Sequence, residues 1–213
     1  FNHRCTDVDL DNATAHFVDE NGNEVHAKGS RIFGTDGAFS AVRLRMMKTD
    51  RFNFNQEYLT HGYKELLLPA NPDGTHMIDK NVLHIWPRGE YMLIALPNYD
   101  GSYTCTLFFP YDGEYSFNSL QTKEQVEDFF KNVFPDFYDL MPDLAEEYFQ
   151  NPTASLVMTQ CEPWNYQDKV MLMGDAAHAI VPFYGQGMNA GMEDCSVFQE
   201  MLDEYGNDWD GLF

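Results

Sequence analysis

The sequence predicts a mixed α+β and α/β fold, in which an α/β part that carries a ligand-binding turn is combined with an antiparallel sheet. Two observations predict it. In residues 170–194 an apolar strand runs through an acidic turn into a glycine-rich helix start, as in α/β ligand sites. In residues 61–109 short apolar segments alternate with turn signals, as in antiparallel sheets. We therefore expect residues 1–50 and 161–213 in the α/β part and residues 51–160 in the sheet part.

The N-terminal residues predict a hairpin followed by a short strand. Asn21 and Gly22 form a turn signal between β-prone segments at residues 14–18 and 25–27. Residues 31–33 are then expected to form a short strand that leads into a turn at residue 34.

The central residues predict an antiparallel meander. The strand candidates and turns are residues 61–68, 75–78, 82–87, 92–96 and 103–109, with turns at 72–74, 88–89 and 100–101. Alternate residues of a strand point to the same side of the sheet, so alternate residues of three of these strands are expected to share one face. This face comprises Leu83, Ile85, Met92, Ile94, Leu96, Thr104, Thr106 and Phe108. Most apolar sheet faces pack against a helix, so the pattern alone leaves open whether this face lines a pocket.

Helical patterns follow the sheet. Thr122 and Gln125 form a capping box, and an apolar face within residues 126–133 ends before Pro135. A further short helix is expected near Leu144. The remaining strands are expected at residues 153–159 and 170–173.

Residues 170–194 carry the pattern with the most chemical content. Asp175 follows the strand directly, where a carboxylate can accept hydrogen bonds from sugar-type hydroxyls. Pro182, Gly185 and Gly187 let the backbone pass close to a flat ligand. The helix that contains Met188 would then direct its free N–H groups and the positive end of its dipole at that ligand. A bare Gly-Asp pair is more often an ordinary strand-to-helix turn. A ligand-binding function can therefore be inferred only from the longer pattern of residues 174–189.

The longer run resembles the FAD-binding motif of the flavoprotein aromatic hydroxylases. Residues 174–178, Pro182 and residues 185–189 resemble the ribityl-binding motif of that family, and residues 34–43 resemble its second internal signature. The resemblance implies part of a Rossmann-like FAD-binding domain, an antiparallel-sheet substrate domain, and FAD and NADPH as cofactors. The cofactor-binding residues that it implies are Asp36, Gly37, Arg43, Gly174, Asp175, Pro182, Gly185, Gly187, Met188 and Asn189.

Further segments narrow the resemblance to members of the family that hydroxylate L-kynurenine. These segments are residues 83–88, 92–98, 104–108 and 181–191. The implied enzyme uses NADPH to reduce FAD and O2 to form 3-hydroxykynurenine, so that the flavin performs the difficult step. The substrate contacts that the resemblance implies are Leu83, Ile85, Met92, Ile94, Leu96, Phe108, Pro182, Phe183, Tyr184 and Gln186.

The resemblance implies neither a catalytic side chain nor a metal. His178 is expected to order the turn, and neither His178 nor Tyr184 is expected to carry a proton. No Gly-x-Gly-x-x-Gly turn precedes Gly34, so we expect an internal fragment that is inactive by itself. Residues 185–190 fit Gly-x-Gly-x-x-Ala, but the glycines do not follow the strand directly, which disfavours a dinucleotide fingerprint.

Composition excludes other classes of function. A net charge of −21 argues against nucleic acid as a partner, because nucleic-acid binding needs a basic footprint. The four scattered cysteines suggest neither a zinc site nor a disulfide framework. No apolar run is long enough to cross a bilayer and no secretory signal is present, so we expect a cytoplasmic protein with small-molecule partners. Two alternatives stay open: another flavin-dependent aromatic hydroxylase, or a non-catalytic flavin-fold fragment that acts as an acidic binding module.

Overall fold

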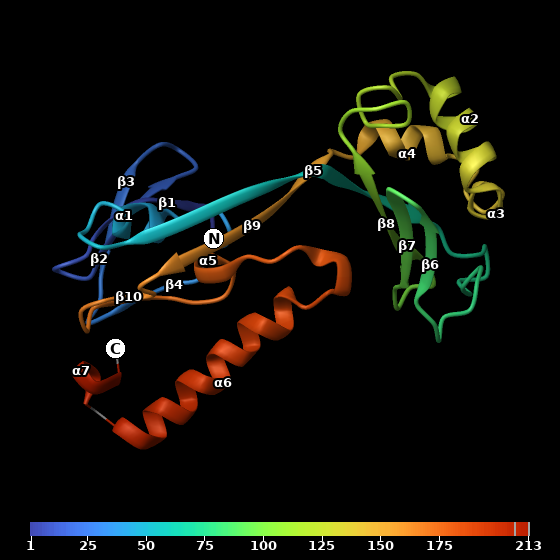
Figure 1. Cartoon of the computed structure of the whole chain (residues 1–213). Helices are drawn as coiled ribbons and strands as arrows, with labels where there is room; N and C mark the ends of the chain where they lie inside the picture. Colours follow the sequence, from blue (N-terminus) through green and yellow to red (C-terminus); the bar gives the residue numbers. More distant parts are fainter. Residues whose placement is uncertain (207, 213) are drawn as a thin grey trace. The chain divides into compact units, whose positions relative to one another are not determined.

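The structure, a computed structural model, describes residues 1–206 and 208–212 and divides the chain into two compact units (Figure 1). The first unit comprises Phe1–Tyr58 and Val157–Phe213, and the second comprises Leu59–Leu156. The boundaries expected from the sequence lie near residues 50 and 160. The strands β5 (Asn53–Leu68) and β9 (Ala154–Glu162) each begin in one unit and end in the other.

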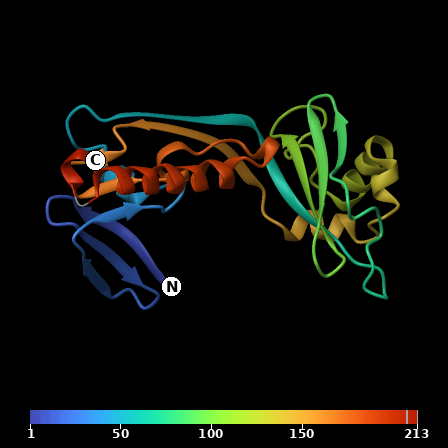
Figure 2. The ribbon, with the colours of Figure 1, turned by 90° about the horizontal axis from the view of Figure 1, so that it is seen from below.

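The first unit opens with a three-stranded antiparallel sheet of β1 (His3–Asp9), β2 (Thr14–Asp19) and β3 (Glu24–Lys28) (Figure 2). The predicted hairpin of β2 and β3 is confirmed. At its turn the Asp19 carboxylate accepts hydrogen bonds from the backbone N–H groups of Asn21 and Asn23, each at 2.8 Å. The strand β1 was not predicted, because its residues are mostly polar.

The second sheet of the first unit brings together segments that are far apart in the sequence. Its strands lie in the order β10 (Asn165–Tyr166), β11 (Val170–Leu172) and β4 (Ile32–Gly34), and β11 runs parallel to β4. The predicted strands at residues 31–33 and 170–173 are thereby confirmed. The helical elements of this unit are α1 (Ala41–Met46), α5 (Asp175–His178), the 3-10 helix η1 (Pro182–Tyr184), α6 (Gly187–Tyr205) and α7 (Trp209–Leu212).

The second unit contains most of a five-stranded sheet. Its strand order is β6 (His84–Arg88), β7 (Tyr91–Pro97), β8 (Tyr103–Pro110), β5 and β9. The meander of β6, β7 and β8 is confirmed, and β5 pairs antiparallel with β8. The predicted strand at residues 75–78 is wrong, since residues 75 and 76 are irregular and residues 77 and 78 form a bend.

Three helices cover one face of this sheet within the second unit: α2 (Lys123–Val133), α3 (Pro135–Tyr138) and α4 (Leu144–Gln150). The predicted capping box is confirmed, because Thr122 Oγ1 accepts a hydrogen bond from the N–H of Gln125 and the Gln125 side chain accepts one from the N–H of Thr122. The buried core that the sheet shares with these helices includes Leu66, Leu68, Leu93, Ala95, Tyr103, Cys105, Leu107, Phe109, Val126, Phe129, Phe130, Phe134 and Phe137.

The other face of the sheet is the one that the sequence predicted to be common to three strands, and the strand registers confirm it. Ile85 pairs with Ile94, Ile94 with Thr106, and Thr106 with Glu65. Because paired residues in a sheet point to the same side, these residues share one face, and we call it the open face. The other paired rows on the open face are Leu96, Thr104 and Leu67, and Met92, Phe108 and Tyr63.

A buried thiol makes the stability of the second unit sensitive to alkaline pH. Burial raises the pKa of Cys105 from 9.0 to about 12. Between these values the unfolded chain binds fewer protons than the folded chain, so stability must fall as pH rises. From about pH 8 to about pH 10.5 we expect a loss of about 2 kcal/mol from this group.

Urea unfolding at the two pH values checks this prediction, with Cys105→Ala as the comparison. Tyr148 also has a pKa raised by burial and is present in both proteins, so the difference between their pH slopes isolates the thiol. Equal slopes for the two proteins would contradict the prediction.

Candidate cofactor site

The parallel pairing of β4 and β11 places two loops at the same edge of the sheet. Leu172 pairs with Gly34, and the N–H of Met173 donates to the carbonyl of Gly34 at 3.0 Å. Both strands therefore end together, and both loops leave from their carboxyl ends. In open α/β sheets this is where ligands bind.

A cleft of about 580 Å³ opens at this edge. Thr35 and Gly37 of the first loop form part of its lining. The second loop and α6 contribute the rest, namely Met173, Gly174, Asp175, Ile180, Pro182, Gly185, Gly187, Met188, Gly191, Met192 and Cys195. The structure thus brings together the predicted cofactor residues Gly37, Gly174, Asp175, Pro182, Gly185, Gly187 and Met188.

The polar groups of this cleft fit the ribityl chain and the flavin ring of FAD. Asp175 is exposed, and its carboxylate has no hydrogen-bond partner among the described residues. The first backbone hydrogen bond of α6 runs from Ala190 N to Gln186 O, so the N–H groups of the first turn have no acceptor within the helix. Carboxylate oxygens suit ribityl hydroxyls, and a helix start suits the negative edge of a reduced flavin.

The backbone at Gly185 and Gly187 leaves room for a flat ligand. A Cβ atom added at either position would meet no atom within 4 Å. Gly185 also has a backbone φ angle of +63°, which residues other than glycine rarely adopt. At both glycines the backbone can therefore pass close to a flat ligand, as the sequence predicts.

Asp36 lies beside this cleft, where it organises the start of α1. Its carboxylate accepts hydrogen bonds from Ser40 Oγ at 2.5 Å, from Ala41 N at 2.7 Å and from Val42 N at 3.3 Å. Both carboxylate oxygens are thus occupied by groups of the chain itself. A contact between Asp36 and a cofactor stays a prediction.

Arg43 is 2% exposed and connects α1 to α5. Its guanidinium donates to the carbonyl of Ala176 at 2.6 Å and to the carbonyl of Ala38, and it lies 4.6 Å from the ring centre of Phe54. Burial lowers the pKa of this guanidinium. Its cofactor contact also stays a prediction, and the hydrogen bonds show how Arg43 acts indirectly, by holding the loop after Gly37 against α5.

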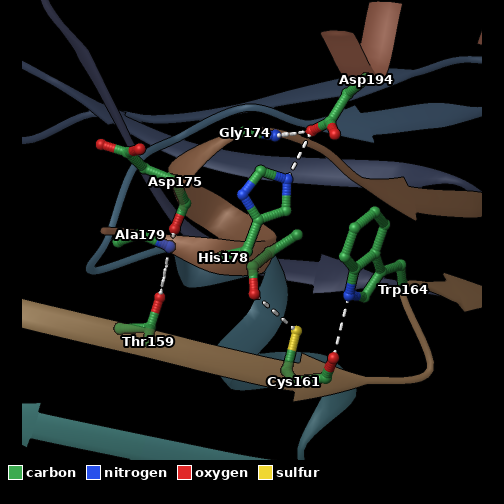
Figure 3. Close-up of polar contacts among 9 residues, drawn as sticks. Thr159, Cys161, Trp164, Gly174, Asp175, His178, Ala179 and Asp194 are labelled. Carbon is green, nitrogen blue, oxygen red and sulfur yellow. Dashed lines mark hydrogen bonds and ion pairs between the residues drawn. The ribbon is translucent and has the colours of Figure 1, made fainter. Parts of the chain in front are cut away.

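His178 has an acidic partner that the sequence analysis missed. Asp194 Oδ2, on α6, accepts from the N–H of Gly174 at 2.6 Å and lies 2.8 Å from His178 Nε2 (Figure 3). The indole ring of Trp164 lies 4.9 Å from the imidazole ring. Asp194 is the last residue of the stretch 170–194, but no role was predicted for it, because its partners Gly174 and His178 precede it by 20 and 16 residues.

The predicted substrate contacts fall into two groups, one in each unit. Ile85 and Leu96 are each about half exposed on the open face, whereas Phe108 is 3% exposed and packs near Tyr63, with ring centres 6.4 Å apart. Leu83 directly precedes β6 and is also about half exposed. The other predicted contacts on this face are Met92 and Ile94, and those in the first unit are Pro182, Phe183, Tyr184 and Gln186.

Tyr184 is 89% exposed. The predicted cofactor residue Asn189 lies at the start of α6, where its Nδ2 donates a hydrogen bond to Gln186 Oε1 at 3.0 Å.

Within residues 1–206 and 208–212, no helix is long and apolar enough to span a membrane. In the same residues no group of three or more His, Cys, Asp or Glu side chains is arranged to hold a metal ion.

Comparison with known proteins gives the family and the fold. The profile of the FAD binding domain family matches residues 1–205. Kynurenine 3-monooxygenase of Flavobacterium johnsoniae is 56% identical over 214 residues, which cover 100% of this chain and 48% of the relative. Kynurenine 3-monooxygenase of Dictyostelium discoideum is 60% identical over 194 residues, which cover 91% of this chain and 42% of the relative. The chain thus spans about half the length of the curated relatives it matches.

The fold is similar to that of a solved structure, the tetrameric form of 2-methyl-3-hydroxypyridine-5-carboxylic acid oxygenase, with a TM-score of 0.73. The match covers 99% of this chain and 53% of the chain in that structure. Its sequence identity is 19%, so the likeness concerns the fold alone. Together with the family match, this likeness confirms the predicted combination of an FAD-binding part with an antiparallel sheet.

Proposed function

The chain belongs to the FAD binding domain family, and on this premise we propose that the full-length protein is an FAD-dependent monooxygenase that hydroxylates L-kynurenine to 3-hydroxykynurenine with NADPH and O2. The observation that carries the proposal is the cleft at the ends of β4 and β11, where both predicted motifs meet. The Flavobacterium johnsoniae relative supports the choice of L-kynurenine, because its 56% identity is measured over the whole of this chain, the segments of the open face included.

In this proposal the first unit holds the cofactor. The Asp175 carboxylate accepts hydrogen bonds from ribityl hydroxyls, and the N–H groups at the start of α6 stabilise negative charge on the ring. Bound FAD would supply the redox chemistry, namely acceptance of a hydride from NADPH and reaction with O2. Pro182 and Phe183 would lie beside the ring and restrict the approach of water.

The open face supplies the substrate surface in this proposal. Ile85, Ile94 and Leu96 offer aliphatic contacts to an aromatic ring, and they contribute no group that competes with the ring for reactive oxygen. The amino group of L-kynurenine already activates the neighbouring ring carbon, so the proposal requires no strong base from the protein. The chain's task is to position the substrate and to exclude water.

The proposal places the enzyme in the cytoplasm, in keeping with the four cysteines, all of which are free thiols. Its other partners are small molecules, L-kynurenine and O2.

The decisive experiment measures NADPH consumption by the full-length protein supplied with FAD, with and without L-kynurenine, while mass spectrometry follows 3-hydroxykynurenine. We expect oxidation to depend on L-kynurenine and to match product formation about one to one, since the electrons from NADPH enter the hydroxylation. Oxidation that yields only H2O2 would show that L-kynurenine triggers reduction without being the substrate. Absence of oxidation by a protein that holds FAD would refute the choice of substrate and redirect the search to other aromatic compounds.

A further inference from the structure

One carboxylate oxygen joins α6 to the turn before α5. Asp194 Oδ2 accepts the N–H of Gly174 at 2.6 Å and is paired with His178 Nε2 at 2.8 Å (Figure 3). The Asp194 side chain is 14% exposed and that of His178 is 21% exposed. Hydrogen bonds to a carboxylate that is largely shielded from water are stronger than those at the surface, so this junction is energetically significant.

The backbones of the two elements also meet at the junction. A Cβ atom added at Gly191 would lie 3.6 Å from the Cα atom of Gly174. Gly174 itself has φ of +58°, in the region that favours glycine. The backbones of the helix and the turn are therefore neighbours here, at a distance that would place an added Cβ atom in ordinary van der Waals contact.

Few other contacts hold α6 in its unit. None of its described residues is buried, and the ring of Phe198 lies 5.2 Å from that of Phe33 in β4. Met188 and Met192, on the side of the cleft, are 73% and 63% exposed. The Asp194 junction is thus a principal constraint on where the N-terminal half of α6 lies.

The junction joins two elements that line the cleft, the turn before α5 and the helix α6. Gly174 of the turn directly precedes Asp175, and α6 supplies Gly187, Met188 and Gly191. We infer that Asp194 and His178 are positioning residues for FAD, which fix the spacing between the Asp175 carboxylate and the N–H groups at the start of α6. This inference rests on FAD as the cofactor in the proposed function and adds to it the residues that set the geometry of the cleft.

The surroundings of His178 support this role. Its ring lies beside Trp164, whose Nε1 donates to the carbonyl of Cys161 at 2.9 Å, and the Cys161 thiol donates to the carbonyl of Ala177 at 3.3 Å. The bond from Cys161 ties β9 to α5, and Cys161 lies on the side of His178 away from Asp194 (Figure 3). The imidazole is therefore fixed between two neighbours, as a positioning group requires.

The test compares variants of the full-length protein in their affinity for FAD, measured by flavin fluorescence on titration of the apoprotein. Asp194→Leu removes both hydrogen bonds and should weaken FAD binding by about tenfold to a hundredfold. Asp194→Asn keeps an oxygen that can accept both bonds and should stay within about threefold of the wild type. Glu193→Gln is the matched control, because Glu193 is an exposed neighbour on the same helix, and we expect no change.

A pair of further variants distinguishes positioning from a general loss of structure. His178→Phe removes one of the two bonds and should weaken FAD binding less than Asp194→Leu does. The double variant should bind FAD as Asp194→Leu does, because both substitutions break the same junction. The melting temperature of each apoprotein and the visible circular dichroism of the bound flavin complete the comparison, since displaced walls alter the flavin signal even in a folded protein.

Wild-type affinity for FAD in the Asp194→Leu variant would overturn the inference, as would an Asp194→Asn variant that is as weak as Asp194→Leu. A full-length wild-type protein that does not bind FAD would instead refute the proposed function. If it binds FAD and the series behaves as expected, but L-kynurenine is not hydroxylated, the proposed substrate fails and the positioning role stands.

Discussion

Replacing Asp175 by alanine in the full-length protein is expected to weaken FAD binding by about a hundredfold, because the charge-assisted hydrogen bonds that we propose between its carboxylate and the ribityl hydroxyls would be lost. Asp175 lines the cleft, and its carboxylate has no competing partner among the described residues, so little else in the chain should respond to its removal. The measurement is the flavin content after gel filtration, followed by a fluorescence titration of the apoprotein with FAD.

Two comparisons sharpen this expectation. Asp175→Asn keeps one acceptor oxygen and loses the charge, so its affinity should fall between those of the wild type and Asp175→Ala. Asp203→Asn alters an exposed carboxylate near the other end of α6 and should leave FAD binding unchanged. Unchanged flavin content in Asp175→Ala would remove Asp175 from the cofactor site.

Replacing Phe109 by alanine is expected to cost about 3–5 kcal/mol of folding stability, the usual effect of deleting a buried phenyl ring. Phe109 is fully buried in β8, and its ring lies 4.9 Å from that of Phe129 and 5.3 Å from that of Phe117. The substitution would open a cavity between the sheet and α2. Urea unfolding followed by circular dichroism gives the change in the free energy of unfolding.

The matched control for Phe109 is Tyr99→Ala, which removes an aromatic side chain that is exposed to solvent at a turn of the same unit. Its effect should stay within about 0.5 kcal/mol. A similar unfolding midpoint for the two variants would show that the aromatic core does not determine the stability of the second unit.

The open face was predictable from sequence because alternation alone assigns residues to the two sides of a strand. The period of two put Ile94 on the same side as Ile85 and Thr106, and the strand registers agree. The same alternation sent Leu93 and Leu107 to the opposite side, where the helices bury them. The pattern did not determine which of the two faces the helices would cover, since both faces carry apolar residues.

The false strand at residues 75–78 has a local cause. Asp73 Oδ1 accepts hydrogen bonds from both the N–H and the hydroxyl of Thr75, and Asn71 Nδ2 donates to Thr75 Oγ1 and to the carbonyl of His76. These side chains offer the backbone partners that compete with a strand ladder. The β-prone residues of this segment therefore lie in a turn.

The cofactor motifs were recognisable by spacing, whereas the contacts that support them were not. The capping of α1 by Asp36 joins residues five and six positions apart, and the bond from Arg43 to the carbonyl of Ala176 spans most of the chain. The bond from Arg43 depends on the parallel pairing of β4 and β11, which no local pattern specifies. Asp194 was missed because its partners Gly174 and His178 lie 20 and 16 residues before it.

The path of the chain through β5 and β9 has a consequence for how new specificities arise. These strands are neighbours in one sheet, and between them residues 59–156 form an uninterrupted insertion with its own hydrophobic core. A segment that enters and leaves through adjacent strands behaves as a cassette, because recombination at two nearby junctions can exchange it whole. A protein built in this way can thus receive a different open face in one genetic event, while both loops of the cleft at the ends of β4 and β11 are inherited unchanged.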